Sequence, residues 1–570
     1  MLDLSKYQSL GEALKDAVER FAPEICLMES DREKEKERLT YEEFGLRAHP
    51  FARALQESGF SEGDRASIIM TNQSKYLISA YAVLYSGGVL VPLDWMLSPE
   101  EQWELFHHSG ARVLITEFSI WQRLCKSTAR PDASQLGLVL VTEAPRKADL
   151  QGARRWEEFR SDAMPNFVAR RRSDLAVIGY SSGTGGRPKG CLLTHENYLE
   201  QCIGLTSIYP FWPGIRYLSI LPTSHAIDFM VGFIGPFTCG ATVVHLRTLR
   251  PEYFRDAFTR YKIGYVSVVP LVLKNLRAAM QARLDALSRG KRLIFNALVS
   301  VNKGLTKGRP RSWLSRRLLH QVHDSLGGEL RAIIVGGAFS EPETLQFFYD
   351  LGIPVANGYG QTEACTAVTV NDLRPFRADT VGKPLPGIEL QIADPDSEGI
   401  GEVCVRGKTV MAGYLDDPEL SAETIVDGWL HTGDRGKIDQ RGHLQLFGRS
   451  KNMIVSPEGL NIYPENVEGF FEDLPVEEFC VFAANYIWPQ NTMLGEQLVL
   501  VLRLKKDQAL DEQLRNLIIS RNSRLRNYQR VHGVVLTSEE FPRTTGRRLK
   551  RHLLRDRLAQ LDRRSSIQGI

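Results

Sequence analysis

The residues from Tyr180 to Gly190, YSSGTGGRPKG, combine hydroxyls, glycines and a basic end in one loop. They follow DLAVIG, an apolar run typical of a buried strand. Glycines let backbone N–H groups approach an anion closely, hydroxyls add donors, and a flexible basic end can follow phosphates. We therefore predict a polyphosphate-binding loop; a purely structural glycine-rich turn is the alternative. The residues expected to contact the phosphates are Ser181, Ser182, Gly183, Thr184, Gly185, Gly186 and Lys189.

Three better-known glycine motifs were compared with this loop. Its spacing fits neither G-x-x-x-x-G-K-[ST] nor G-x-G-x-x-G. Gly179 to Gly183 does match G-x-S-x-G, the nucleophile elbow of hydrolases, which needs a helix directly after the serine. Here the chain continues GTGGRPKG, which cannot propagate a helix. We therefore favour phosphate binding over a serine hydrolase.

Two further segments carry polar groups suited to a nucleotide. Gly358 to Glu363, GYGQTE, follows the strand-like run GIPVAN; its aromatic ring could stack on a base, and Glu363 could hold Mg²⁺. Trp429 to Asp434, WLHTGD, ends in a carboxylate that could accept hydrogen bonds from a ribose diol. The alternatives are an ordinary loop with a solvated Glu363 and a turn that contains Asp434.

Bulk composition sets limits on the class of protein. A chain of 570 residues is too long for one hydrophobic core, so two or more domains are expected. The hydrophobic share of 43% and charged share of 24% are those of a globular protein, and a net charge of +3 argues against a general polyanion binder. The eight cysteines are scattered without a C-x-x-C pair, which favours reduced thiols in a cytoplasmic protein over disulfides or a structural zinc site. The N-terminal MLDLSKYQSL does not fit a signal peptide.

Most of the chain alternates helical and strand-like patterns. Residues 40–59 place Phe44, Phe51 and Leu55 on one helical face, with Pro50 predicted to kink or divide the helix. The run from Tyr76 to Leu93 has no charge over 18 residues; it fits a membrane span by length, but its Gly-Gly pair favours a buried helix, a turn and a buried strand. Such alternation predicts α/β layers.

The predicted pattern of secondary structure changes twice toward the C-terminus. From about Gly382 the chain has short β runs with turns, and after Arg449 a new α/β unit begins. The predicted fold class is therefore α/β: a large N-terminal domain (1–449) of layered α/β subdomains plus a β-rich subdomain, followed by a small α+β C-terminal domain (450–570).

Together these motifs resemble those of the acyl-adenylate-forming (AMP-binding) superfamily, which includes acyl-CoA synthetases, luciferases and peptide-synthetase adenylation domains. The resemblance extends from about Leu39 to Arg557, with the motifs in the family's order. Tyr180 to Gly190 matches the family's phosphate loop, except for Gly185 where a second Thr is usual. Ligands of the family's reaction are ATP, Mg²⁺, a carboxylic acid and a thiol acceptor such as coenzyme A.

The resemblance implies a role for each matching residue. Leu221 to His225 is similar to the segment whose His lies beside the acyl site, and Lys451 to the hinge about which a small mobile C-terminal domain rotates. Thr184 and Glu363 correspond to the Mg²⁺ ligands. The positions similar to adenine, phosphate and ribose contacts are Gly336, Gly337, Ala338, Asn357, Gly358, Tyr359, Gly360, Thr362, Asp434 and Arg449.

The branch resembled is that of long-chain fatty acyl-CoA synthetases. Ala278 to Gly328 is a basic, helical, insertion-like segment similar to one in that branch, and Gly448 to Glu468 also reads like it. We expect a medium- or long-chain fatty acid as substrate. The basic helix either lies against a membrane surface, which would make the protein peripheral there, or is a solvated charged face.

The C-terminal motif departs from the family pattern. Where P-[RK]-T-x-[TS]-G-K is usual, the chain reads Pro542 to Arg551, PRTTGRRLKR, so Arg548 takes the place of the catalytic Lys and Lys550 lies two residues further on. Arg and Lys differ in shape and donor geometry. Either residue could supply charge to the reacting phosphate, or adenylation could be weak.

Two hypotheses follow for the acceptor and the activity. The first is a fatty acyl-CoA ligase; the second is an enzyme that loads an acyl carrier protein, or a catalytically impaired acyl-binding relative. The segment from Arg521 to Arg564 holds 13 Lys or Arg against 4 Asp or Glu, which suits the phosphates of coenzyme A or an acidic carrier. It lacks a recognition motif, so no specific nucleic acid partner is expected.

Overall fold

The computed structural model describes residues 2–132, 136–181, 189–307, 309–337, 339–449, 454–455, 461–488, 497–543, 549–561 and 566–569. The chain divides into two compact units. The first consists of Met1–Ser181, Pro188–Leu390 and Val405–Leu430, and the second of Ser182–Arg187, Gln391–Cys404 and His431–Ile570. The boundary expected at residue 450 falls within the second unit and remains a prediction.

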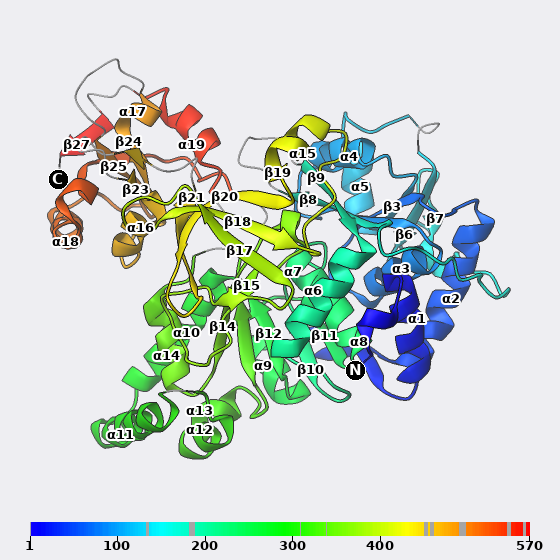
Figure 1. Cartoon of the computed structure of the whole chain (residues 1–570), viewed down its shortest axis with the longest axis horizontal. Helices are drawn as coiled ribbons and strands as arrows, with labels where there is room; N and C mark the ends of the chain where they lie inside the picture. The colour runs from blue at the N-terminus through cyan, green and yellow to red at the C-terminus, as the bar shows by residue number, and fades with distance from the viewer. Residues whose placement is uncertain are drawn as a thin grey trace. The chain divides into compact units, whose positions relative to one another are not determined.

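The first unit contains a seven-stranded sheet in the order β7-β6-β5-β3-β4-β8-β9 (Figure 1). All neighbours are parallel except β8 and β9. The strands are β3 (Arg65–Ile69), β4 (Val89–Pro92), β5 (Val113–Glu117), β6 (Leu138–Thr142), β7 (Arg154–Arg155), β8 (Leu175–Ser181) and β9 (Lys189–Thr194). The intervening helices are α2 (Tyr41–Glu57), α3 (Ser74–Tyr85), α4 (Pro99–His108) and α5 (Phe118–Lys126). Parallel strands with crossover helices confirm the expected α/β layers.

A nine-stranded sheet of the same unit has the order β16-β15-β14-β13-β12-β10-β11-β1-β2. Its central strands from β14 to β1 are parallel, and the strands at both ends are antiparallel. The strands are β1 (Ile25–Asp31), β2 (Lys34–Thr40), β10 (Arg216–Ser219), β11 (Thr242–Leu246), β12 (Tyr265–Val268), β13 (Ala332–Val335), β14 (Val355–Tyr359), β15 (Thr369–Val370) and β16 (Lys383–Pro384). The carboxyl ends of β12, β13 and β14 therefore share one edge.

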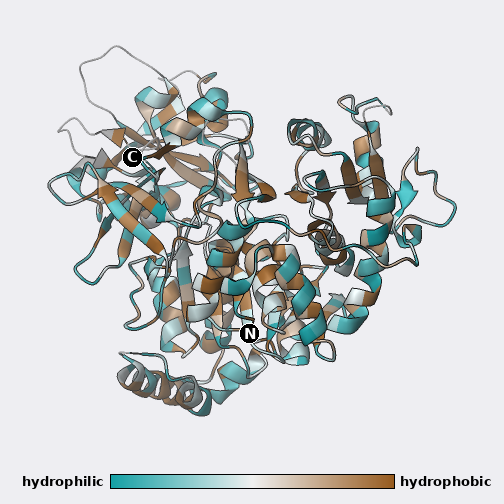
Figure 2. Cartoon of the chain, turned by 45° about the vertical axis from the view of Figure 1, so that its right-hand side comes forward, coloured by the Kyte–Doolittle hydropathy of each residue, from teal (hydrophilic) through white to brown (hydrophobic). Residues whose placement is uncertain are grey.

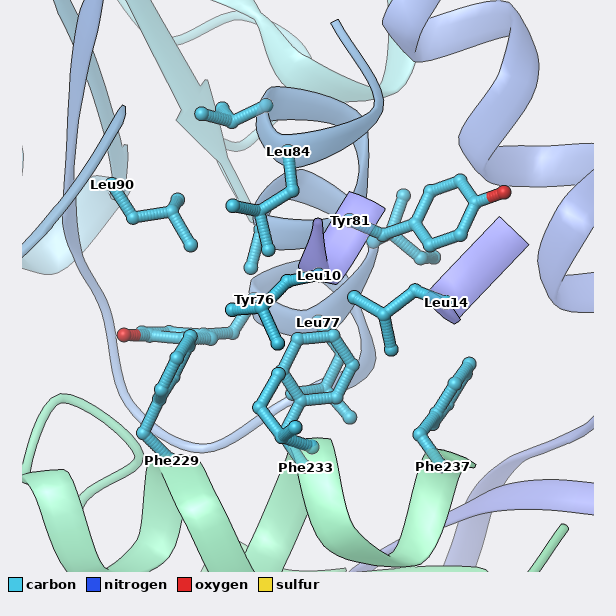
Figure 3. Close-up of a cluster of buried hydrophobic side chains, with 14 of the residues drawn as sticks. Leu10, Leu14, Tyr76, Leu77, Tyr81, Leu84, Leu90, Phe229, Phe233 and Phe237 are labelled. Carbon is cyan, nitrogen blue, oxygen red and sulfur yellow. The ribbon is translucent and has the colours of Figure 1, made fainter. Parts of the chain in front are cut away.

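A buried cluster joins helices of the first unit (Figure 3). Phe229, Phe233 and Phe237 recur at four-residue spacing and point from one helical segment toward α1 (Leu10–Arg20) and α3. Their rings pack edge to face, with centroids 5.8 and 5.3 Å apart. Tyr76 and Tyr81 of α3 are almost wholly buried in the same cluster. The uncharged run at 76–93 is thus a core helix followed by a buried strand, as predicted.

The helix predicted within residues 40–59 is present as α2, Tyr41–Glu57, and Phe44, Phe51 and Leu55 are buried. The expectation that Pro50 could divide it is wrong, because α2 is continuous through Pro50. Proline removes the hydrogen bond to the carbonyl four residues earlier, which belongs to Leu46. Leu46 is 69% exposed, so this turn of α2 lies at the surface of the protein. Among the described residues, no helix is both long and apolar enough to cross a membrane.

The second unit contains a four-stranded sheet, β24-β25-β26-β27, formed by Glu478–Ala483, Leu498–Arg503, Val531–Leu536 and Ile567–Gly569. Helices α18 (Glu512–Asn522) and α19 (Arg551–Leu558) bury Leu514, Ile518, Leu554 and Leu558 in its cores. The apolar runs within VEEFCVFAAN and QLVLVLRL form β24 and β25. A β-rich region contains β17 (Ile388–Ala393), β18 (Gly401–Gly407), β19 (Ile425–Val426), β20 (Trp429–Ile438) and β21 (Leu444–Arg449). These elements confirm the predicted change from α/β layers to short β strands and then to a second α/β region.

Candidate functional site

The edge formed by the carboxyl ends of β13 and β14 carries the expected glycine-rich segments. Val335 of β13 pairs with Asn357 of β14, so the chain after each strand emerges side by side. A Cβ on Gly336 would lie 3.2 Å from the carbonyl oxygen of Gly358, which keeps these two backbones close. At Gly360 a Cβ would lie only 1.8 Å from the Thr366 oxygen, so no other residue fits there. These glycines let the segments after β13 and β14 pack closely against each other and against the Thr366 backbone.

Glu363 is held at this edge by two contacts. It lies in the short 3-10 helix η4 (Thr362–Ala364), directly after β14. The Tyr414 hydroxyl donates to Glu363 Oε1 at 3.1 Å, and the Met411 amide donates to the Glu363 carbonyl at 2.9 Å. One carboxylate oxygen is therefore oriented by a neutral donor.

Tyr414 reaches Glu363 because its segment runs beside β9. The Leu415 amide donates to the Gly190 carbonyl at 2.7 Å, and the Ala412 amide donates to the Leu192 carbonyl at 2.9 Å. This pairing forms an antiparallel bridge between Tyr414 and Cys191. The sequence interpretation missed Tyr414; the available signal was an aromatic residue in the glycine-bounded run MAGYL.

Lys189 and Ser181 flank the predicted phosphate loop. They pair across β8 and β9, and Lys189 Nζ lies 5.1 Å from the centroid of the Tyr414 ring. Ser181 Oγ is buried and has no hydrogen-bond partner among the described residues, so it is an orphaned donor at the loop. The hydrolase reading finds no support, because the next described residues after Ser181 form the antiparallel strand β9.

Several predicted contact residues lie outside the described residues. They are Ser182, Gly183, Thr184, Gly185, Gly186, Ala338, Lys451 and Arg548. Their roles remain predictions.

Burial and the charge of Glu363 together raise the pKa values of two neighbouring side chains, Tyr414 and Cys191. Burial raises the pKa of the Tyr414 hydroxyl well above its usual range, and the Glu363 carboxylate adds to this rise. Burial likewise raises the pKa of the Cys191 thiol well above normal, again with a contribution from Glu363. At neutral pH Tyr414 is therefore a hydrogen-bond donor, and Cys191 is an inert thiol rather than a nucleophile or metal ligand. The local charges are the Glu363 carboxylate and the Lys189 ammonium.

His225 lies in the loop between β10 and the short helix α7 (Ala226–Phe229). Its Nε2 lies 3.0 Å from Asp94 Oδ2, and Asp94 follows β4. The His225 side chain is 35% exposed, whereas that of Asp94 is 8% exposed. The imidazole is thus accessible on one side and fixed by a buried carboxylate on the other. Asp94 was not predicted from the sequence, because 131 residues separate it from His225.

A buried polar network fixes the same loop. Asp228 accepts hydrogen bonds from Tyr217 at 3.1 Å, Ser219 at 2.7 Å and the Thr223 hydroxyl at 3.0 Å. The Asn72 side chain accepts from the Thr223 amide at 2.8 Å and donates to the Leu221 carbonyl at 2.6 Å.

Burial of Asp228 has an electrostatic consequence. Its side chain is fully buried, which raises its pKa to about 6 although the three hydroxyl donors oppose this shift. The sequence reading passed over Asp228, and the missed signal was a single acid within the apolar run AIDFMVGFIG.

Three contacts bring these groups to one place in the first unit. The Thr366 hydroxyl donates to the Ala226 carbonyl, next to His225, at 3.2 Å. A Cβ on Gly179 of β8 would lie 3.1 Å from Thr362 Cγ2, so η4 packs against the strand that enters the phosphate loop. The side chain of Ile227 approaches Gly336 and Gly337. The predicted residues gathered here are Ser181, Lys189, His225, Gly337, Asn357, Gly358, Tyr359, Gly360, Thr362 and Glu363.

The remaining described site residues lie in the second unit. Asp434 and Arg449 pair across β20 and β21, and their side chains form an ion pair with Oδ1 and Nε 3.0 Å apart. Asp434 is largely buried, and its amide donates to the Thr432 hydroxyl at 3.1 Å. Lys550 precedes α19, and its amide donates to the Pro542 carbonyl at 2.7 Å.

Two groups of side chains could serve as metal ligands: a cluster in the second unit, and Glu363 in the first. Glu402, Cys404 and His431 offer ligand atoms within 4.8 Å of one another in the second unit. However, Glu402 already accepts from the Gly433 amide at 2.9 Å and lies 3.0 Å from His431 Nδ1, and burial raises the pKa of the Cys404 thiol to about 11. Glu402 and His431 therefore already have partners within the protein, and the Cys404 thiol is protonated at neutral pH. Glu363, with one oxygen oriented by Tyr414, fits a hard divalent cation that also binds phosphates.

The chain was compared with known families and structures. Residues 14–415 match the family described as AMP-binding enzyme. Long-chain-fatty-acid–CoA ligase FadD15 of Mycobacterium bovis is 30% identical over 436 residues, covering 73% of this chain and 70% of the relative. Long-chain-fatty-acid–[acyl-carrier-protein] ligase AEE15, chloroplastic, of Arabidopsis thaliana is 25% identical over 541 residues, covering 81% and 73%. The solved structure of the anthranilate CoA ligase AuaEII in complex with anthranoyl-AMP aligns over 98% of this chain and 99% of that chain, with a TM-score of 0.76 and 20% identity.

Proposed function

The chain belongs to the AMP-binding enzyme family, and we propose that it uses ATP and Mg²⁺ to activate a medium- or long-chain fatty acid as an acyl-adenylate and then forms a thioester with coenzyme A. The observation that carries this proposal is that the Tyr414 side chain contacts both Glu363 and Lys189, while the Thr366 hydroxyl, shortly after Glu363, donates to the carbonyl next to His225. A carboxylate and an ammonium group thus lie beside one aromatic ring, and the segment that carries the imidazole contacts the chain that follows η4. The fatty acid as substrate is supported by the 30% identity to a long-chain-fatty-acid–CoA ligase.

In the first half-reaction a carboxylate oxygen of the fatty acid attacks the α-phosphorus of ATP. A new P–O bond forms, the bond to the leaving pyrophosphate breaks, and no protein nucleophile is needed. Because both reactants are anionic, the protein must neutralise charge and align the attack. Lys189 and the orphaned Ser181 hydroxyl would contact phosphate oxygens, and Glu363 and Thr184 would hold Mg²⁺, which offsets the negative charge of the triphosphate when bound.

Other residues would position the remaining groups. Tyr359 and the glycine backbone of 336–337 would contact adenine, Asp434 and Arg449 the ribose, and His225 would border the acyl chain. Arg548 or Lys550 would add positive charge at the reacting phosphate. Before the second half-reaction, the small C-terminal domain would rotate about Lys451. The thiol then loses its proton, its sulfur bonds to the acyl carbon and AMP leaves.

A second candidate acceptor is an acyl carrier protein. One relative, 25% identical and aligned with 81% of this chain, is named a long-chain-fatty-acid–[acyl-carrier-protein] ligase. Adenylation is common to both candidates, so the site described above does not distinguish them. The eight free cysteines agree with the cytoplasmic location expected from the sequence.

Thioester formation tests the proposal. The protein is incubated with ATP and Mg²⁺ and with acetate, octanoate, palmitate, oleate or benzoate in turn, with coenzyme A, with acyl carrier protein or without an acceptor. Mass spectrometry should detect acyl-coenzyme A from octanoate, palmitate or oleate. Product only on the acyl carrier protein would make that protein the acceptor in place of coenzyme A. Thioester from benzoate alone would make aryl acids the substrate class in place of fatty acids. Absence of acyl-adenylate with every acid would refute ligase activity.

A further inference from the structure

The helix α11 (Arg289–Thr306) has apolar side chains on two faces. One face is built into the first unit: Phe295 and Val299 pack against its core, and Asn302 and Thr306 are buried. Asn302 accepts from the Ser315 hydroxyl at 2.7 Å and donates to the Asp350 carbonyl at 3.0 Å. The helix is thus fixed against its neighbours α12 (Ser312–Leu318) and α14 (Pro342–Asp350).

The other face of α11 is apolar although it faces solvent. Ile294, Val301 and Leu305 are 64%, 49% and 47% exposed, and their spacing of seven and four residues places them on one side of the helix. Leu293 beside them is 71% exposed, and Trp313 of α12 is 70% exposed. A helix at the surface of a domain normally turns polar residues outward. The helix lies at the lower edge of Figure 1, and Figure 2 shows apolar (brown) residues along it.

Positive charge surrounds this exposed apolar face. The segment 286–319, which includes α11 and α12, contains nine Lys or Arg and no Asp or Glu. Arg292, Lys303 and Arg316 pair with Asp285, Asp350 and Glu329. Within the described part of the chain, no ion pair involves the other six basic residues, which are exposed: Arg289, Lys291, Lys307, Arg309, Arg311 and Arg317. They lie at the two ends of α11 and in the segment after it.

We propose that α11 and α12 form a docking surface for an anionic phospholipid bilayer, with Ile294, Val301, Leu305 and Trp313 entering the headgroup region. An apolar line flanked by long basic side chains is the pattern of an interfacial helix, in which Lys and Arg reach the lipid phosphates while apolar groups are buried. A second copy of this chain does not suit this surface, because an isologous contact would bring its unpaired basic residues together. The surface deepens the proposed function, since fatty acids partition into bilayers; its binding to lipid does not depend on catalysis.

Vesicle sedimentation with the full chain, without ATP or fatty acid, tests the proposal. The chain should bind vesicles of equal parts phosphatidylglycerol and phosphatidylcholine at least about tenfold more tightly than pure phosphatidylcholine, and added salt should weaken binding. The double variant I294E/V301E should bind anionic vesicles about tenfold more weakly. The matched control L46E/M164E, at residues 69% and 77% exposed elsewhere in the first unit, should bind like the wild type.

Each other outcome overturns the proposal. The proposal is wrong if the wild type does not bind vesicles or binds them equally well whatever their lipid charge. It is also wrong if I294E/V301E and L46E/M164E lose vesicle binding to the same extent. Self-association, or binding of acyl carrier protein, that I294E/V301E abolishes without vesicle binding by the wild type would assign the face to a protein instead. Acyl-adenylate formation from octanoate in vesicle-free solution is measured separately: both double variants should retain it, so a failed lipid surface and a failed ligase proposal give different results.

Discussion

Tyr414 donates its hydroxyl hydrogen to Glu363 Oε1 at 3.1 Å, and the same ring lies 5.1 Å from the ammonium nitrogen of Lys189. One buried aromatic side chain therefore contacts both the proposed Mg²⁺ ligand and a proposed phosphate contact. Its raised pKa keeps it a donor across the neutral range. The Tyr414 hydroxyl orients the carboxylate that the cation would need.

The substitution Tyr414→Phe removes this donor and keeps the ring. A hydrogen bond to a charged group contributes about 1.5–3 kcal/mol, so we expect acyl-adenylate formation to fall at least about tenfold and its dependence on Mg²⁺ concentration to shift. Initial rates of pyrophosphate release over a Mg²⁺ titration measure both. The matched control is Tyr349→Phe, which removes a hydroxyl bonded at 2.7 Å to the Thr306 carbonyl in the same unit. Equal rates for Tyr414→Phe and wild type would contradict the positioning role.

The Asp94–His225 pair predicts a non-additive effect. Asp94→Asn removes the charge that fixes His225, so kcat/KM for the fatty acid should fall about tenfold while KM for ATP stays near the wild-type value. In a His225→Ala background the same Asp94 change should cost little more. Fully additive losses in this double-mutant cycle would show that Asp94 does not act through His225.

Asp228 predicts a pH dependence of stability. Its folded-state pKa of about 6 lies above the usual aspartate pKa of 3.8, so the fold favours the protonated acid. This contribution to stability is fully present below pH 4 and is lost as pH rises through about 6. The Asp228→Asn variant cannot ionise, so its melting temperature should gain on the wild type between pH 4 and 6 and hold that gain above pH 7. Differential scanning fluorimetry across this range measures the difference, and a constant difference would contradict the shifted pKa.

Arg548 and Lys550 are distinguished by separate changes to alanine. Loss of the cation that contacts the reacting phosphate should slow acyl-adenylate formation about 100-fold or more in one variant. Thioester formation from supplied acyl-adenylate should be much less affected, because no bond to phosphorus forms or breaks in that step. Single-turnover assays of the two half-reactions provide the comparison. Unchanged adenylation in both single variants and in the double variant would show that this segment does not act in the first half-reaction.

Local patterns in the sequence predicted most of the fold. Apolar runs such as VLITE and LVLVLRL became β5 and β25, because short buried strands are specified by nearby residues. At Pro50 the prediction of a divided helix was wrong, and the hydrogen bond that proline removes lies on a surface turn of α2. What the sequence could not predict were partners distant along the chain. Tyr414 reaches Glu363 across 51 residues, and Asp94 and His225 meet although they follow strands of two different sheets, β4 and β10.

Fatty-acid adenylation at the edge that contains Glu363 can be measured as fatty-acid-dependent exchange of labelled pyrophosphate into ATP. This exchange reports reversible acyl-adenylate formation and needs no acceptor, so the identity of the thiol does not affect it. We expect exchange that requires Mg²⁺ and a fatty acid such as octanoate or palmitate and that falls at least about 100-fold in Glu363→Gln, with the variant still folded. Exchange in Glu363→Gln equal to that of the wild type, or no exchange by folded wild-type protein with any fatty acid, would contradict this expectation.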